Sequence, residues 1–114
     1  MTWLKNLFQT APINQFPSQE WLKQLKTDKN KIILDVRSAR KFVSGHIPKA
    51  HNVDMFSRNF NSEMSQFDID TNLYVYCRSG KRSMMAFRKL YKLGFEKLNN
   101  LQSGIMSYKG PIKK

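Results

Sequence analysis

Short apolar runs alternate along this chain with stretches whose apolar residues recur at helical spacing. Two runs, residues 31–37 and 73–77, are rich in β-branched and aromatic residues, which is typical of buried strands. Weaker strand signals cover 50–53 and 95–101. Helical spacing begins after Ser18 and recurs over 38–45, over 84–94 and, weakly, over 55–64. Because strands that alternate with helices build parallel sheets, we predict an α/β fold with a small parallel sheet flanked by helices on both faces.

Residues at the expected helix ends fit this assignment. Ser18 follows a proline and is the candidate N-cap of the first helix, with Glu20 in its first turn. Gly45 and Gly94 each close a helical stretch, as glycine commonly does. The pair at 103–104, Ser-Gly, is expected to open a final helix or turn.

The only cysteine, Cys77, lies where the strand over 73–77 leads toward the helix over 84–94. Backbone N–H groups at a helix start are unpaired, and the helix dipole adds partial positive charge there. Such a position, with cations nearby, favours thiolate over thiol, and the same N–H groups can hold an anion or a negatively charged sulfur adduct. Gly80 lets the turn adopt backbone angles that are closed to other residues.

Two interpretations of this cysteine compete. A free cysteine is often only a small buried apolar residue. Three cations and a glycine within five residues instead favour a reactive nucleophile in an anion-binding loop made of Arg78, Ser79, Gly80, Lys81, Arg82 and Ser83. Arg37 ends the other central strand. Because parallel strands end at the same edge of a sheet, Arg37 is a candidate second anchor for an anion held over Cys77.

Length and charge narrow the class of function. A chain of 114 residues has room for one domain, 1–114, in which residues 1–12 form an N-terminal extension. The amphipathic part of that extension, residues 1–10, is expected to dock on the domain, with contact to a membrane surface as the lesser option. The 20 Lys and Arg residues outweigh the 8 Asp and Glu residues, and the net charge of +12 suits anionic partners. The chain nevertheless has no clear nucleic-acid-binding motif.

Missing signals bear on location and cofactors. No run approaches the ~20 apolar residues of a transmembrane segment, and the chain start lacks the apolar core of a signal peptide. A single cysteine excludes an internal disulfide, so we expect a cytoplasmic protein. His46 and His51 have no partners at metal-ligand spacing, so we expect neither a metal nor a cofactor. We expect His46 to tie down its turn and Asp35 to fix the surrounding backbone.

Four blocks of the chain resemble the rhodanese family of sulfurtransferases. They are Ile33-Leu34-Asp35-Val36-Arg37, Phe42 with Gly45-His46-Ile47-Pro48, Ala50-His51-Asn52-Val53, and Tyr76-Cys77-Arg78-Ser79-Gly80-Lys81-Arg82-Ser83. Their order and spacing are specific, and the resemblance extends over most of the chain, from about Pro17 to Tyr108. The chain departs from the family pattern at Lys41, where an acidic residue is common, and this departure bears on the choice of substrate.

The resemblance implies one small α/β domain in which Cys77 carries sulfur as a persulfide. Cys77 would take the outer sulfur of thiosulfate or a similar anionic donor, release sulfite, and pass the sulfur to cyanide or a thiol. The loop N–H groups would hold the persulfide, while Arg78, Lys81 and Arg82 would attract the donor and Arg37 would assist at the rim.

Two alternatives stay open. The first is a sulfur-relay or binding module that serves a protein partner or a tRNA thiolation pathway; it would use the same cysteine and would account for the basic charge. The second is a phosphatase or arsenate reductase, because related cysteine phosphatases use a similar loop. The four residues between Cys77 and Arg82 disfavour this second alternative, since the related dual-specificity phosphatases have one residue more, to fit a phosphate group.

Overall fold

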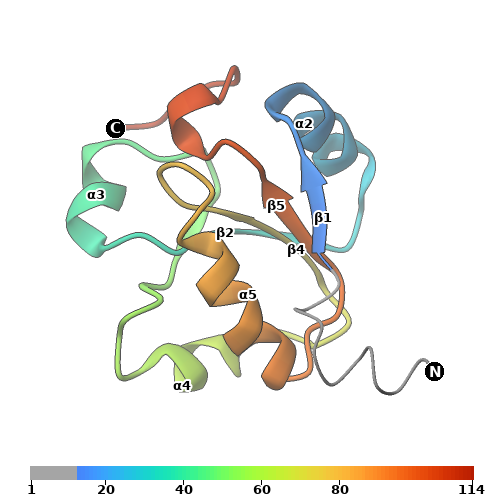
Figure 1. Ribbon diagram of the computed structural model, residues 1–114, viewed down its shortest axis with the longest axis vertical. Coiled ribbons are helices and arrows are strands. Elements are labelled where there is room, and N and C mark those ends of the chain that lie inside the picture. The colour runs from blue at the N-terminus through green and yellow to red at the C-terminus, as the bar shows by residue number, and fades with distance from the viewer. Residues whose placement is uncertain (1–12) are drawn as a thin grey trace.

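A five-stranded sheet in which all paired strands are parallel organises the protein (Figure 1). The computed structural model describes residues 13–114. The strands are β1 (Ile13–Phe16), β2 (Lys31–Asp35), β3 (His51–Asn52), β4 (Asn72–Tyr76) and β5 (Leu98–Leu101). They lie in the order β1-β5-β4-β2-β3. The predicted α/β fold with a small parallel sheet is confirmed.

Helices cover both faces of the sheet, as predicted. They are α2 (Ser18–Thr27), α3 (Ala39–Ser44), α4 (Phe60–Met64) and α5 (Ser83–Lys92), followed by the 3-10 helix η1 (Ile105–Ser107). One face packs on α2 and the other packs on α4 and α5. Figure 1 shows α3 and η1 near the loop that follows β4. No helix within residues 13–114 combines the length and the apolar character that a membrane span requires.

Strand β4 is the middle strand of the sheet, and its side chains alternate between the two faces. The side chains on the α4–α5 face are Leu73, Val75 and, just beyond the strand, Cys77; those on the α2 face are Tyr74 and Tyr76. On the α2 face, Trp21 is fully buried and meets the ring of Tyr74 edge to face, with ring centroids 5.7 Å apart. The loop of Cys77 therefore starts from a strand that is packed on both sides.

Several elements are shorter than the sequence predicted. β2 ends at Asp35, whose side chain accepts the N–H of Arg37 at 2.9 Å and turns the chain there. β4 ends at Tyr76, so Cys77 lies in the loop that follows it. The expected strands over 50–53 and 95–101 are reduced to β3 and β5, and the weak helix over 55–64 is reduced to α4. Some of these turns, at residues 36–37, 55–56 and 77, line the cavity described below.

Two features beside α2 differ from the prediction. The sequence pattern does not predict β1, because its two middle residues are polar and exposed; pairing with β5 stabilises it instead. Ser18 is not the N-cap of α2. Pro17 occupies that position, and the hydroxyl of Ser18 accepts the N–H of Lys109 at 2.9 Å, which ties the C-terminal segment to α2. The extension predicted over 1–12, with its amphipathic part over 1–10, lies outside the described residues.

The buried Trp21 provides a test of this core. The substitution Trp21→Ala should lower the free energy of unfolding by about 3–5 kcal/mol, because removal of a fully buried indole leaves a large cavity. The control Val43→Ala removes an exposed side chain and should change the free energy of unfolding by less than ~0.5 kcal/mol. Urea unfolding followed by circular dichroism measures both, and equal losses would contradict this description of the core.

Candidate functional site

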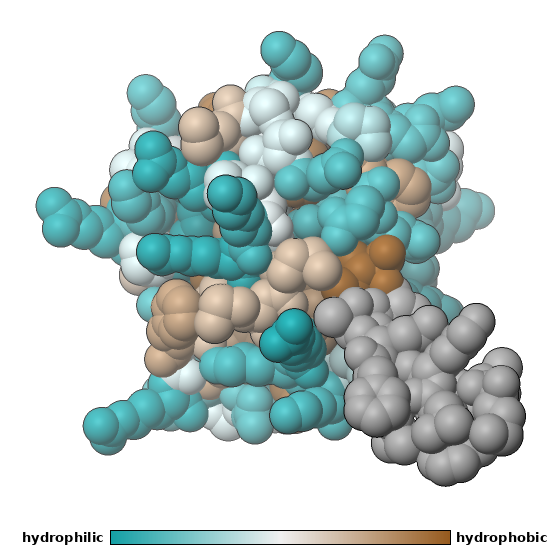
Figure 2. Space-filling view, in the orientation of Figure 1, coloured by the Kyte–Doolittle hydropathy of each residue, from teal (hydrophilic) through white to brown (hydrophobic). Residues whose placement is uncertain are grey.

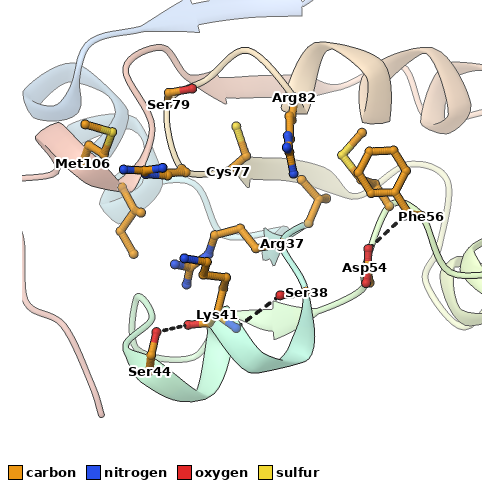
Figure 3. Close-up of a pocket in the computed structure, with 14 residues that line it drawn as sticks. Arg37, Ser38, Lys41, Ser44, Asp54, Phe56, Cys77, Ser79, Arg82 and Met106 are labelled. Carbon is orange, nitrogen blue, oxygen red and sulfur yellow. Dashed lines mark hydrogen bonds between the residues drawn. The ribbon is translucent and has the colours of Figure 1, made fainter.

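The carboxyl ends of β2 and β4 meet at one edge of the sheet, beside a cavity of about 640 Å³ (Figure 3). Asp35 and Tyr76 are register partners at these ends, so the predicted meeting of the two strand ends is confirmed. The cavity is lined by Val36, Arg37, Ser38, Lys41, Ser44, Asp54, Met55, Phe56, Cys77, Arg78, Ser79, Arg82, Ile105 and Met106. Since open parallel sheets bind ligands beyond this edge, the cavity that contains the cysteine is the candidate functional site.

The sulfur atom of Cys77 accepts two backbone hydrogen bonds from the loop that it opens. The donors are the N–H of Gly80, at 3.0 Å, and the N–H of Ser83, at 3.3 Å. Ser83 is the first residue of α5, so the sulfur satisfies an N–H group that the helix leaves unpaired. Cys77 is only 2% exposed, although it lines the cavity. The two N–H groups and the positive end of the helix dipole stabilise negative charge on this sulfur.

The cysteine loop is pressed against the turn that leads into η1. The N–H of Ile105 donates to the carbonyl oxygen of Cys77 at 2.9 Å. Gly80 has a φ of +89°, and a Cβ atom at this position would overlap the carbonyl oxygen of Gln102. Only glycine suits the position, because it needs both the left-handed backbone region and the absence of a side chain. The turn therefore fixes the shape of the loop around the sulfur.

A buried hydroxyl ties the loop to the sheet. The Oγ atom of Ser83 lies 2.9 Å from the carbonyl oxygen of Gly80 and 2.8 Å from Oδ1 of Asn100 on β5. The Nδ2 group of Asn100 donates in turn to Oε1 of Gln15 on β1, at 2.8 Å. Sequence reasoning missed Asn100 and Gln15, which lie far from Cys77 in the chain. The sequence signal that could have pointed to Asn100 is a polar residue inside the expected strand over 95–101, and the structure shows it to be buried.

The loop residues named from the sequence do not all face the cavity. Arg78, Ser79 and Arg82 line it, and Figure 3 shows Arg82 extending from the loop beside Cys77. The guanidinium carbon of Arg82 lies 5.9 Å from the ring centroid of Phe56, which suits a cation–π contact. Lys81 is exposed and does not line the cavity, so its role in anion binding stays a prediction.

Arg37 lines the cavity, but its guanidinium also makes several bonds within the protein. Its Nε lies 2.9 Å from Oδ1 of Asp35, and its Nη2 lies 2.6 Å from Oδ2 of Asp35 and 2.7 Å from the carbonyl oxygen of Gly45. Burial acts to lower the pKa of Arg37, but the hydrogen bonds and negative charge of Asp35 outweigh it and raise that pKa. Because Asp35 is fully buried, it depends on this partner for charge balance. The role of Arg37 as a second anion anchor stays a prediction.

Two further polar side chains near the strand ends have structural contacts. The hydroxyl of Tyr76 accepts the N–H of Ile47 at 3.1 Å. Burial raises the pKa of Tyr76, and the charge of Asp35 adds to this effect, so the hydroxyl stays protonated at neutral pH. The Nδ1 atom of His46 lies 2.9 Å from the carbonyl oxygen of Phe42, and the two rings stack with centroids 3.8 Å apart. These contacts fit the structural role expected for His46.

Nine residues that line the cavity were not predicted as site residues, and three of them have large side chains from other elements. Lys41 comes from α3, Met106 from η1, and Phe56 from the turn before α4, where Asp54 Oδ1 accepts the N–H of Phe56 at 2.9 Å. Of these three, only Lys41 stood out in the sequence, as a departure from the family pattern. The other two lie in segments whose own pattern is weak, and the fold alone brings them to Cys77.

Residues 18–110 match the family of rhodanese-like domains. Because this match covers most of the chain and the fold and the cysteine loop agree with it, the protein belongs to the rhodanese-like domain family.

Related proteins support this assignment. A sulfurtransferase of Allochromatium vinosum is 28% identical over 96 residues, which span 84% of this chain and 88% of the relative. The putative sulfur carrier protein YrkF of Bacillus subtilis is 26% identical over 100 residues, which span 88% of this chain and 53% of the relative. The crystal structure of a rhodanese-like domain protein from Staphylococcus aureus has the same fold, with a TM-score of 0.73 and 24% identity over 89% of this chain and 99% of that one.

The close approach of Gly80 to Gln102 can be tested by substitution. Gly80→Ala should lower the free energy of unfolding by about 1–3 kcal/mol, because alanine is strained at a positive φ. Overlap of the new Cβ with the backbone of Gln102 should lower it by a further ~1–3 kcal/mol. The control Gly94→Ala shares a positive φ, but its new Cβ would meet only ordinary contacts with Ile69, so only the first loss should occur. Urea unfolding distinguishes the two, and equal losses would show that the loop is not held against this turn.

Proposed function

We propose that this protein is a sulfurtransferase that carries one sulfane sulfur atom on Cys77 as a persulfide. The observation that carries the proposal is the geometry of the sulfur, which accepts N–H groups from Gly80 and Ser83 at the start of a helix, beside a cavity lined by cations. Membership of the rhodanese-like family and similarity to a protein named as a sulfurtransferase support sulfur transfer as the general activity.

The first half of the proposed cycle loads the sulfur. The Cys77 thiolate attacks the outer sulfur of thiosulfate, a new S–S bond forms, and the bond to the sulfonate sulfur breaks with its electron pair, which releases sulfite. Arg78 and Arg82 line the approach and would attract the dianion, with Arg37 at the rim. The Gly80 and Ser83 N–H groups would stabilise the negative charge that the persulfide carries.

The second half unloads the sulfur. A nucleophile such as cyanide or a thiolate attacks the outer sulfur of the persulfide, and the Cys77 thiolate leaves. Neither half needs a metal, a redox cofactor or a second cysteine for its electron balance. The tight loop also favours this chemistry over phosphate transfer, because its N–H groups converge on a single sulfur atom rather than on the larger phosphate group.

A second candidate function is sulfur relay, in which the physiological acceptor is a protein rather than a small thiol. One observation favours it: a relative that covers most of this chain is named a putative sulfur carrier protein. The two functions share Cys77 and differ in the acceptor. Rapid turnover with small thiols supports the enzyme, whereas a persulfide that survives small thiols supports the relay.

Replacing the proposed nucleophile tests the mechanism. Cys77→Ser should lower kcat for transfer from thiosulfate to cyanide by at least about a thousandfold, because the sulfur itself is the nucleophile. The wild-type protein should show the parallel double-reciprocal lines of a ping-pong mechanism. Circular dichroism serves as the control for folding of the variant. A folded Cys77→Ser protein with near-wild-type turnover would rule out this mechanism.

The cations of the site provide a second test. Arg82→Ala should lower kcat/KM for thiosulfate by about ten- to a hundredfold, because it removes a charged contact at the cavity. Arg88→Ala is the matched control, since Arg88 on α5 is an exposed arginine, as Arg82 is, but does not line the cavity. Equal effects of the two substitutions on kcat/KM would show that only the overall charge matters and that Arg82 has no specific role.

A further inference from the structure

The cavity at Cys77 is larger than a small donor such as thiosulfate requires, and its ends are apolar. Phe56 is 60% exposed and Met106 is 67% exposed. Figure 3 shows them at opposite ends of the cavity, with Cys77 between them. Single exposed apolar side chains are common on protein surfaces. Two large ones that flank the same cavity are less easily explained by chance, and a small anion between them would leave both in water.

The polar part of the cavity lining is strongly cationic. It includes four cations, Arg37, Lys41, Arg78 and Arg82, and one carboxylate, Asp54. That carboxylate accepts the N–H of Phe56 at 2.9 Å and so has a structural task in the turn. The excess of positive charge favours an acidic ligand.

The mixture of side chains resembles a protein interface. Phenylalanine, methionine and arginine are the types enriched at interface cores. The 5.9 Å contact between Arg82 and Phe56 places a cation and an apolar anchor side by side. Figure 2 shows a band of hydrophobic side chains across the visible face, over α5 and toward α4, with hydrophilic side chains extending above and below it.

The burial of the sulfur limits how a partner can approach. Cys77 is 2% exposed and its sulfur faces the loop N–H groups, so the flat surface of a folded protein cannot reach it. A thiol on a projecting loop or tail can enter the cavity, while the surface around that thiol covers Phe56 and Met106 at its two ends.

We propose that the surface around the cavity, formed by Lys41, Phe56, Arg78, Arg82 and Met106, docks an acidic protein that inserts a thiol on a projecting segment toward Cys77. The proposal rests on the proposed persulfide function and specifies its acceptor. The apolar anchors and the cations would bind the partner, and the transfer step stays the same: the partner thiolate attacks the outer sulfur, and the Cys77 thiolate leaves.

Discharge of the loaded protein to two synthetic peptides tests this proposal. The protein is first loaded with thiosulfate. Each peptide has one cysteine and one leucine, flanked by four glutamates in the first and four lysines in the second, and dithiothreitol serves as the uncharged thiol. We expect the acidic peptide to discharge the persulfide at least about tenfold faster than the basic peptide at low salt. The difference should shrink to below about threefold near 0.5 M salt, where screening is strong.

Matched variants show whether this preference belongs to the surface around the cavity. Lys41→Glu should lower the acidic-to-basic rate ratio at least about fivefold, whereas Lys23→Glu on α2 changes the net charge equally and should keep the wild-type ratio within about twofold. Phe56→Ala and Met106→Ala should each lower the rate with the acidic peptide relative to dithiothreitol. Ile69→Ala, which removes an exposed isoleucine that does not line the cavity, should not.

Each contrary outcome has one meaning. Equal rates with both peptides, or equal effects of Lys41→Glu and Lys23→Glu, would overturn the docking proposal while the persulfide function stands. A protein that never loads sulfur would overturn the proposed function and, with it, this inference. If a single-stranded RNA oligonucleotide binds in a way that Lys41→Glu abolishes, and the acidic peptide shows no preference, the surface is a nucleic-acid site and the docking proposal is wrong.

Discussion

Two backbone N–H groups that point at one sulfur atom are the interaction on which the site depends. They belong to Gly80 and Ser83, and they fix where the loop turns and where α5 begins. The sulfur takes the place of a side-chain oxygen as the acceptor for an unpaired N–H at a helix start. A negative charge on this atom would strengthen an interaction that the fold already makes, so the proposed reactivity would draw on the same geometry as the stability of the loop.

The rest of the molecule holds that geometry in place. β4 is buried on both faces and delivers Cys77 to the sheet edge, while the turn before η1 presses on Gly80 from the other side. The hydroxyl of Ser83 links the loop to Asn100 on β5. A loop held from three directions cannot widen easily, and this rigidity suits a carrier of one sulfur atom better than a binder of a tetrahedral oxyanion.

Positive charge in the site has two different uses. Arg37 balances the buried carboxylate of Asp35 and bonds to the carbonyl oxygen of Gly45, so much of its hydrogen-bonding capacity supports the turn after β2. Arg78 and Arg82 line the cavity from the cysteine loop itself. We therefore expect anion recognition to depend mainly on the loop cations and backbone N–H groups. Arg37 would contribute less, because its pairing with Asp35 reduces the positive electric field that it offers to an anion.

The sequence predicted the local features well, because they depend on neighbouring residues. The apolar run that ends near Cys77, the glycine in the loop and the helix that follows all lie within about twenty positions, and the structure agrees with their order. β1, Asn100 and Phe56 could not be predicted in the same way. β1 forms through pairing with β5. The side chain of Asn100 on β5 accepts a hydrogen bond from Ser83, and the ring of Phe56, in the turn before α4, contacts the guanidinium of Arg82. Such contacts join distant parts of the chain, and no local pattern encodes them.

Whether Cys77 carries sulfur can be measured directly as the mass of the intact protein after incubation with thiosulfate. We expect the wild-type protein to gain the mass of one sulfur atom, dithiothreitol to reverse the gain, and Cys77→Ser to show no gain. A gain that persists in Cys77→Ser, or a wild-type protein that gains no sulfur from thiosulfate, would show that Cys77 is not the sulfur carrier.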